Sequence, residues 1–207
     1  AYLKSIQLTP AKARAQVEKR LADFKVTALG DPTVDPPIKG WVETAQDNLA
    51  AAQKDFDEAT EIPQRLAARL ALVAAQKAVD QARVEADKVA TAGEGQLLFE
   101  TQCARCHTKG WSYFDPTRGL VPLPSPQGSG AFGPSLRGGT VVEQFPGEPI
   151  DDPTTPGFIK QVEWVTNGVD ANKGYGVRGI SSGRMPHFGV ILRKSQIDEI
   201  VAYERNL

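Results

Sequence analysis

The sequence predicts an all-α protein in two parts, an alanine-rich helical domain over residues 1–92 and a second helical domain over residues 93–207. Three observations support this prediction. Apolar residues of the first part recur at alternating spacings of three and four, which is typical of packed helices. Both cysteines and both histidines lie in the second part. Gly93 and Gly95 interrupt the alanine-rich pattern, and beyond them we expect short helices joined by long loops.

The first helix is predicted to begin at Thr9-Pro10. The Thr9 hydroxyl can cap free backbone amides, and Pro10 at the first helical position loses no hydrogen bond. Gly30-Asp31-Pro32 then ends the helix, and the chain through Pro36-Pro37 reads as a stiff connector. One apolar face is expected at Val17, Leu21, Phe24 and Ala28.

Two heptad-like rows of apolar residues follow, separated by a predicted turn at Thr60-Glu61-Ile62-Pro63. The residue before a proline resists helical geometry, so the chain is expected to reverse there. The first row is Val42, Ala45, Leu49, Ala52, Phe56 and Ala59. The second row is Ala68, Leu72, Ala75, Val79, Ala82, Ala86 and Val89. We therefore predict an antiparallel, coiled-coil-like helical hairpin, with the first helix packed beside it or completing a three-helix bundle.

An alternative to the hairpin remains open at this stage. The first row also continues in phase through Leu66, Leu70 and Val73. One long helix kinked at Pro63 would place those three residues on the same face as the first row.

The second domain is predicted to contain three helices, near residues 95–106, 158–167 and 195–206. Two segments rich in proline and glycine, residues 111–130 and 145–157, are too irregular to assign to any element.

The pentapeptide Cys103-Ala104-Arg105-Cys106-His107 is the strongest chemical signal in the chain. It has the CxxCH spacing of c-type haem attachment. On a helical turn both thiols face one side, where they can add to the two haem vinyl groups, and His107 supplies an axial nitrogen. The alternatives are a disulfide, half of a zinc site or a thioredoxin-like pair. Zinc needs four ligands, and the chain has only one further histidine and no further cysteine.

Met185 is the candidate for the second axial ligand. It is the only methionine, and it lies in the loop Gly183-Arg184-Met185-Pro186 before the last predicted helix. A thioether ligand favours the reduced iron and raises its potential, which suits electron transfer. The alternatives are a methionine that only fills the core, or His187 as a competing ligand.

Residues 93–207 resemble a class I monohaem cytochrome c, and the resemblance rests on five segments around the two ligands. They are Gly95-x-x-Leu98-Phe99, Gly133-Pro134-Ser135-Leu136, Val165-x-Asn167-Gly168, Met185-Pro186-x-Phe188 and Ile197-x-x-Ile200-Val201-x-Tyr203. The resemblance implies a class I cytochrome c fold with long loops and one covalent haem c. It also implies that the first and last helices cross, with Gly95 and Phe99 meeting Tyr203.

Pro134 and Trp164 are also predicted to bind the cofactor, in addition to Cys103, Cys106, His107 and Met185. The resemblance implies that the Pro134 carbonyl accepts a hydrogen bond from the Nδ1–H of His107 and so orients the ligand. Trp164, on the helix before the methionine loop, is the best aromatic candidate to pack on the haem or to bond its propionates.

The predicted function is single-electron transfer, not conversion of a substrate by an enzyme. The partners expected are redox proteins, such as a membrane respiratory complex or a terminal oxidase, and basic residues near the ligand segments could steer acidic ones. These residues are Arg105, Lys109, Arg178, Arg184, Arg193 and Lys194. Alternatives are a haem-based redox or gas sensor, or a haem enzyme with a labile sixth ligand.

Charge and location complete the predictions. A formal net charge of −1 argues against nucleic-acid binding. The resemblance implies a periplasmic or other extracytoplasmic location, because c-type haem attachment is completed outside the cytoplasm. The sequence begins at Ala1 without a methionine, so we expect a signal peptide or a membrane anchor to have preceded it.

Overall fold

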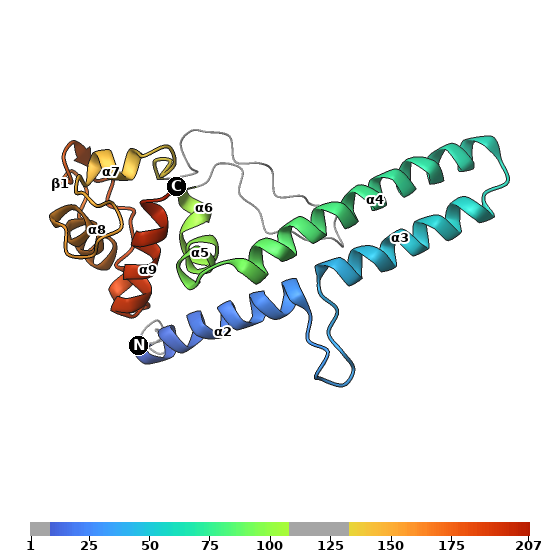
Figure 1. The fold of residues 1–207 in the computed structure, drawn as a ribbon, viewed down its shortest axis with the longest axis horizontal. Helices are drawn as coiled ribbons and strands as arrows, with labels where there is room; N and C mark the ends of the chain where they lie inside the picture. The colour runs from blue at the N-terminus through green and yellow to red at the C-terminus, as the bar shows by residue number, and fades with distance from the viewer. Residues whose placement is uncertain (1–8, 108–132) are drawn as a thin grey trace, which may run out of the picture. The chain divides into compact units, whose positions relative to one another are not determined.

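The computed structural model describes residues 9–107 and 133–207 and is mostly helical (Figure 1). The predicted irregular segment 111–130 therefore lies outside the described residues. The chain divides into two compact units. Of the described residues, 22–92 form one unit, and 9–21, 93–107 and 133–207 form the other.

The first unit is built on α3 (Trp41–Glu58) and α4 (Ile62–Thr91), which pack against each other as an antiparallel pair (Figure 1). The link between them is short, and Pro63 lies in the first turn of α4, where a missing amide hydrogen costs nothing. The predicted hairpin is thus confirmed. A single kinked helix is wrong, and Leu66, Leu70 and Val73, which it would have buried beside the first row, are exposed.

Both predicted apolar rows face inward. Every residue of the two rows is buried or half-buried, with Ala45 and Ala82 almost completely enclosed. Small alanines at these positions let the two helix backbones approach closely. Near the hairpin tip the Arg65 guanidinium lies 5.6 Å from the centre of the Phe56 ring, so the two helices also make a cation–π contact.

Enlarging a residue in one of these inward-facing rows tests how tightly α3 and α4 are packed. Ala45→Leu adds three carbons where only 1 % of the residue is exposed. We expect the free energy of unfolding to fall by about 1–3 kcal/mol, because the larger side chain does not fit between α3 and α4 and forces them apart. Ala50→Leu, at an exposed position of the same helix, should change it by less than about 0.5 kcal/mol. Urea unfolding followed by circular dichroism measures both values, and equal effects would contradict the packing.

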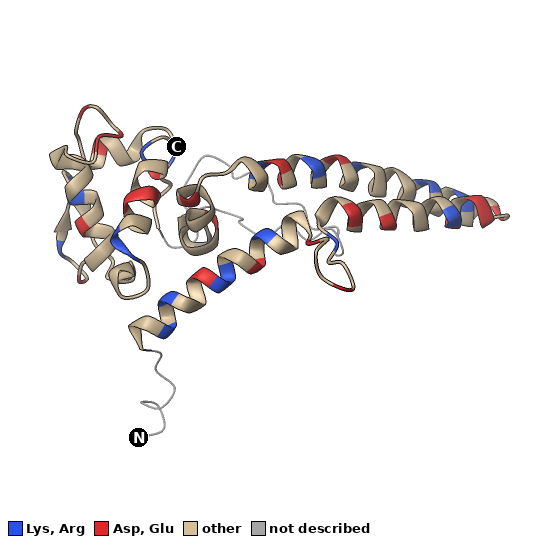
Figure 2. Ribbon diagram, turned by 60° about the horizontal axis from the view of Figure 1, so that its bottom comes forward, with Lys and Arg blue, Asp and Glu red and all other residues tan. Residues whose placement is uncertain are grey.

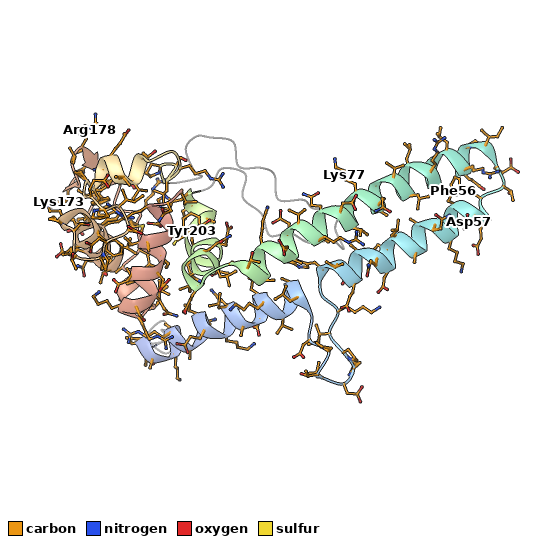
Figure 3. The ribbon with its side chains drawn as sticks, in the orientation of Figure 1. Phe56, Asp57, Lys77, Lys173, Arg178 and Tyr203 are labelled. Carbon is orange, nitrogen blue, oxygen red and sulfur yellow. The ribbon has the colours of Figure 1, made fainter. Side chains whose placement is uncertain are left out.

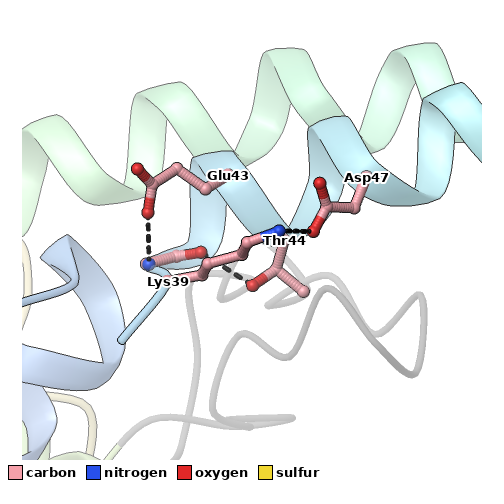
Figure 4. A network of polar contacts seen from close by, with 5 residues as sticks. Lys39, Glu43, Thr44 and Asp47 are labelled. Carbon is pink, nitrogen blue, oxygen red and sulfur yellow. Dashed lines mark hydrogen bonds and ion pairs between the residues drawn. The ribbon is translucent and has the colours of Figure 1, made fainter. Parts of the chain in front are cut away.

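The N-terminus of α3 is held by a small polar network (Figure 4). The Glu43 carboxylate accepts a hydrogen bond from the Gly40 amide at 3.1 Å, and the Thr44 hydroxyl donates to the Gly40 carbonyl at 2.8 Å. Lys39 forms an ion pair with Asp47 one turn further along. The connector before it is closed by two backbone hydrogen bonds between Asp31 and Ile38. This network fixes the direction in which the chain enters the hairpin.

Helix α2 (Pro10–Leu29) has the predicted limits. The Thr9 hydroxyl accepts a hydrogen bond from the Lys12 amide at 3.4 Å, and Gly30 ends the helix with a positive φ of 80°. The predicted apolar face is buried or half-buried. Its expected packing beside the hairpin is wrong for the first half, however, because that half belongs to the other unit.

The first half of α2 joins the core of the C-terminal unit through three contacts. Val17 is buried in that core. The Arg14 guanidinium donates to the Gly189 carbonyl at 3.2 Å, and Glu18 pairs with Arg193 at 2.6 Å. Periodicity identifies the apolar face of a helix but not its partner, which explains the error.

The C-terminal unit begins with a continuous helical stretch made of α5 (Glu94–Leu98), a π-helical segment η1 (Phe99–Cys103) and α6 (Ala104–His107). The unit closes with α9 (Lys194–Glu204), which packs against α5. A Cβ atom on Gly95 would lie 2.1 Å from the Glu199 carbonyl oxygen, so only glycine permits this approach. The Phe99 and Tyr203 rings lie 5.4 Å apart. The implied contact between Phe99 and Tyr203 is therefore present, whereas the atoms nearest to Gly95 are backbone atoms of Glu199 and Ile200.

Between these ends lie shorter elements. α8 (Pro156–Asn167) matches a predicted helix, and its packing partners include α9. The sequence did not predict α7 (Thr140–Gln144), the 3-10 turn η2 (Phe188–Val190) or the two-stranded ribbon. That ribbon pairs β1 (Gly174–Tyr175) with β2 (Gly179–Ile180) in antiparallel fashion. Among the described residues, no helix combines the length and apolar character needed to cross a membrane.

Candidate functional site

The two cysteines lie on the helical stretch that opens the C-terminal unit. Cys103 ends η1 and is buried in the core, whereas Cys106 in α6 is half-buried. Both thiols are free. Burial raises the pKa of the Cys103 thiol, and the nearby Glu204 carboxylate raises it further. The CxxCH segment therefore holds two unlinked thiols on one short piece of helix.

His107 ends α6, and its ring is held in one orientation. Its Nδ1 lies 2.9 Å from the Pro134 carbonyl oxygen. This is the hydrogen bond that the resemblance implied, and it makes Nδ1 the protonated nitrogen. Burial lowers the pKa of His107, although the bond to Pro134 acts in the opposite direction. The ring therefore favours its neutral form and leaves Nε2 available as a ligand atom.

Gly133 supports the His107 ring from one side. A Cβ atom at this position would lie 2.5 Å from Cε1 and 2.7 Å from Nδ1 of His107. The Gly133 amide also donates to the Cys106 carbonyl at 3.0 Å. The pair Gly133-Pro134 thus brackets the imidazole, with the first residue against the ring and the second bonded to its edge.

Met185 lies half-buried in the loop before η2 and packs against the core cluster that contains Cys103. The C-terminus of α8 comes close to this loop, because a Cβ atom on Gly168 would lie 2.7 Å from the Met185 carbonyl oxygen. His187, the competing candidate, is exposed, and its ring lies over Gly168. Of the two candidates, Met185 is half-buried against the core, whereas His187 is exposed.

Trp164 is half-buried on α8 and also packs against this core. Its ring stacks on Tyr175 with centroids 3.9 Å apart, and Tyr175 in turn lies 6.2 Å from Phe145. These aromatic side chains line an open hollow of about 270 Å³. The sequence predicted a role for Trp164 but not its stacking partner, which the ribbon supplies eleven residues further along the chain.

A buried polar network lies in the same unit and was missed by sequence reasoning. The Gln161 side-chain amide donates to the Glu204 carboxylate at 2.9 Å, and the Arg205 guanidinium donates to Gln161 Oε1 at 3.2 Å. Arg205 also donates to the backbone carbonyls of Phe145, Gly147 and Ile150. Burial raises the pKa of Glu204 to about 7, against the lowering effect of the Gln161 bond. A Glu-Arg pair in a last helical turn usually faces solvent, so no local signal marks this one.

The basic residues near the ligand segments are not equivalent. Arg193 pairs with Glu18, and Lys194 pairs with Asp198 at 2.7 Å, so two of the charges are locally compensated. Arg178 and Arg184 are exposed. Lys109 and the side chain of Arg105 lie outside the described parts of the chain.

The zinc alternative finds no support in the part of the chain that the structure describes, which contains no cluster of three or more histidine, cysteine, aspartate or glutamate residues able to hold a metal ion. Comparison with other proteins adds no family assignment: no family model, curated protein or solved structure matches this chain.

Proposed function

We propose that the C-terminal unit carries one covalently attached haem c and serves as a single-electron carrier outside the cytoplasm. The observation that carries the proposal is the hydrogen bond between His107 Nδ1 and the Pro134 carbonyl, formed directly beside a CxxCH sequence. A histidine that ligates a metal usually donates its second ring nitrogen to such an acceptor.

The residues present fit a c-type haem. Cys103 and Cys106 are free thiols that can form thioether bonds, and His107 has its Nε2 unengaged by the Pro134 bond. Met185 offers the soft sulfur expected of the second axial ligand. When bound, a haem with this ligand set exchanges one electron between its ferrous and ferric states.

The protein's own contribution is to orient the ligands and to exclude water. Gly133 and Pro134 hold the His107 ring, which keeps the tautomer fixed and the ligand nitrogen basic. The apolar core around Cys103 and Met185 lowers the local dielectric, and this tunes a redox potential. Expected partners are redox proteins, among them a membrane respiratory complex or a terminal oxidase.

The experiment that tests the proposal is a ferrous absorption spectrum recorded with and without carbon monoxide. We expect covalently bound haem and no prompt spectral change in the wild-type protein, because Met185 closes the iron. The Met185→Ala variant should bind carbon monoxide at once. His187→Ala, which removes the competing candidate, should behave as the wild type.

Two results would contradict the proposal. A chain matured with haem-attachment machinery that holds no covalent haem would exclude a cytochrome. A prompt carbon monoxide complex in the wild-type protein would mean a labile sixth ligand, and would favour a gas or redox sensor or a haem enzyme over an electron carrier.

A further inference from the structure

Helix α4 has a second apolar face in addition to the one that packs on α3. Ile62 is 84 % exposed, Leu66 60 %, Leu70 65 % and Val73 62 %. A helix turns by about 100° per residue, so these four residues lie together, roughly opposite the row that packs on α3. Four large aliphatic side chains on about three turns of helix form an uncovered apolar strip.

This strip continues as a regular heptad row, which we call the outer seam. Its members are Leu66, Leu70, Val73, Lys77, Asp80 and Val84, spaced alternately by four and three residues. Figure 3 shows Lys77 on the side of α4 that faces away from α3. A heptad row with one or two polar members is typical of a helix that pairs in a fixed register with another helix.

Basic residues outnumber acidic ones along the outer seam. Between Ile62 and Val84 the charged residues of α4 are Arg65, Arg69, Lys77 and Arg83, which are basic, and Asp80, which is acidic. Figure 2 shows basic residues in blue and acidic residues in red on the ribbon. One edge of the seam carries Arg69, Gln76 and Arg83, which follow one another at intervals of seven residues. The other edge is lined by Ala67 and Ala74, which are exposed and leave room for a second helix to approach.

These charges argue against a second copy of the same helix. Parallel pairing of two copies would set Lys77 against Lys77 and Asp80 against Asp80 across the seam. Antiparallel pairing can set Lys77 of one copy opposite Asp80 of the other, but it also brings the two edges that carry Arg69 and Arg83 together. Like charges in these positions destabilise a coiled coil and act against that pairing.

We propose that the outer seam of α4 is a docking site for an acidic amphipathic helix of another protein. In that complex, leucine-like residues of the partner would fill the apolar strip, and its carboxylates would lie opposite Arg69 and Arg83. The inference goes beyond electron transfer, because it assigns the hairpin the role of attaching this chain to an acidic helical partner.

The test uses two synthetic four-heptad peptides and the full-length protein. Both peptides carry leucine in their apolar row, one with glutamate and the other with lysine at the flanking positions. We expect the acidic peptide to bind at least about tenfold more tightly at low ionic strength, by calorimetry, and to weaken as salt is added.

Three variants make the test specific. Leu66→Asn with Leu70→Asn should weaken binding of the acidic peptide by more than about tenfold. Val177→Asn with Ile180→Asn makes the same change at exposed positions of the other unit and should leave binding unchanged. Arg69→Glu with Arg83→Glu should reverse the preference towards the basic peptide. All of the positions changed are exposed, and unchanged circular dichroism would show that the variants fold.

Three outcomes would overturn the proposal. If the two peptides bind equally, or if neither binds, the proposal that the seam binds an acidic helix is wrong. Self-association in sedimentation that is lost in the Leu66→Asn, Leu70→Asn variant would assign the seam to a second copy. Co-sedimentation with phosphatidylglycerol vesicles that is lost in that variant, without peptide preference, would assign it to a membrane surface. None of these measurements depends on the haem, so they test the docking site independently of the proposed electron-transfer function.

Discussion

Replacing Gly95 with alanine is expected to destabilise the C-terminal unit by about 3 kcal/mol or more. The added Cβ atom would lie 2.1 Å from the Glu199 carbonyl oxygen and 2.6 Å from its carbon. Both are backbone atoms of α9 and cannot rotate away. Helix propensity alone favours alanine by about 1 kcal/mol, so destabilisation would show that the close approach of the two helices decides the outcome.

Gly93→Ala is the matched control for this prediction. A Cβ atom on Gly93 meets no other atom within 4 Å. Gly93 is the N-cap of α5, where alanine is less favoured than glycine, so this substitution should cost no more than about 1 kcal/mol. Urea unfolding of the full-length protein, followed by circular dichroism and tryptophan fluorescence, compares the two variants. Equal stability of the Gly95→Ala and Gly93→Ala proteins would mean that α5 and α9 do not cross at Gly95.

Glu204→Gln is expected to remove a pH dependence of stability worth about 3 kcal/mol. The Glu204 carboxyl is buried, and burial raises its pKa from 4.5 to about 7 in the folded protein. Between these two pH values the folded chain holds a proton that the unfolded chain has released. Stability therefore falls as the pH rises from 4.5 to 7 and stays at the lower level above pH 7. Each pKa unit corresponds to about 1.36 kcal/mol.

The glutamine variant keeps the shape of the side chain and its ability to accept a hydrogen bond from Gln161. It should be more stable than the wild type at pH 8 and similar to it near pH 4.5. Glu199→Gln, an exposed change in the same helix, should leave the pH profile unaltered. The free energies of unfolding of the wild type and of both variants, measured at intervals from pH 4.5 to 8, test this prediction. An unchanged slope in Glu204→Gln would mean that another group carries the titration.

Local patterns predicted much of this structure because their physical causes are local. Pro63 cannot continue a helix from the previous turn, so the hairpin reversal could be placed from a few residues. The rows of α3 and α4 pack against each other because each helix has a continuous row of apolar residues that faces its neighbour. The CxxCH spacing likewise predicted two cysteines and a histidine on one helical segment, and all three lie on the helical stretch that ends at His107.

Features that depend on distant residues could not be predicted in the same way. The destination of the first half of α2 is decided by the complementary surface around Val17 and by the pairs that Glu18 and Arg14 form. Burial of Arg205 depends on carbonyls more than fifty residues away, which no helical period reveals. The stacking of Trp164 on Tyr175 was missed for another reason: the two residues are only eleven apart, but the ribbon that positions Tyr175 has strands of two residues each, too short to leave a sequence pattern.

The π-helical segment η1 has a geometric consequence for the whole candidate site. Its defining hydrogen bond runs from the Ala104 amide to the Phe99 carbonyl, five residues back, so this turn contains one residue more than an α-helical turn. Gly95 lies before η1 and faces α9, whereas Cys106 and His107 lie after it. The additional residue in η1 therefore sets the direction in which Cys106 and His107 point relative to the face that packs on α9. Deleting one residue here would rotate everything that follows by about 100°, so the CxxCH segment cannot be moved onto a plain α-helix at the same distance from the crossing.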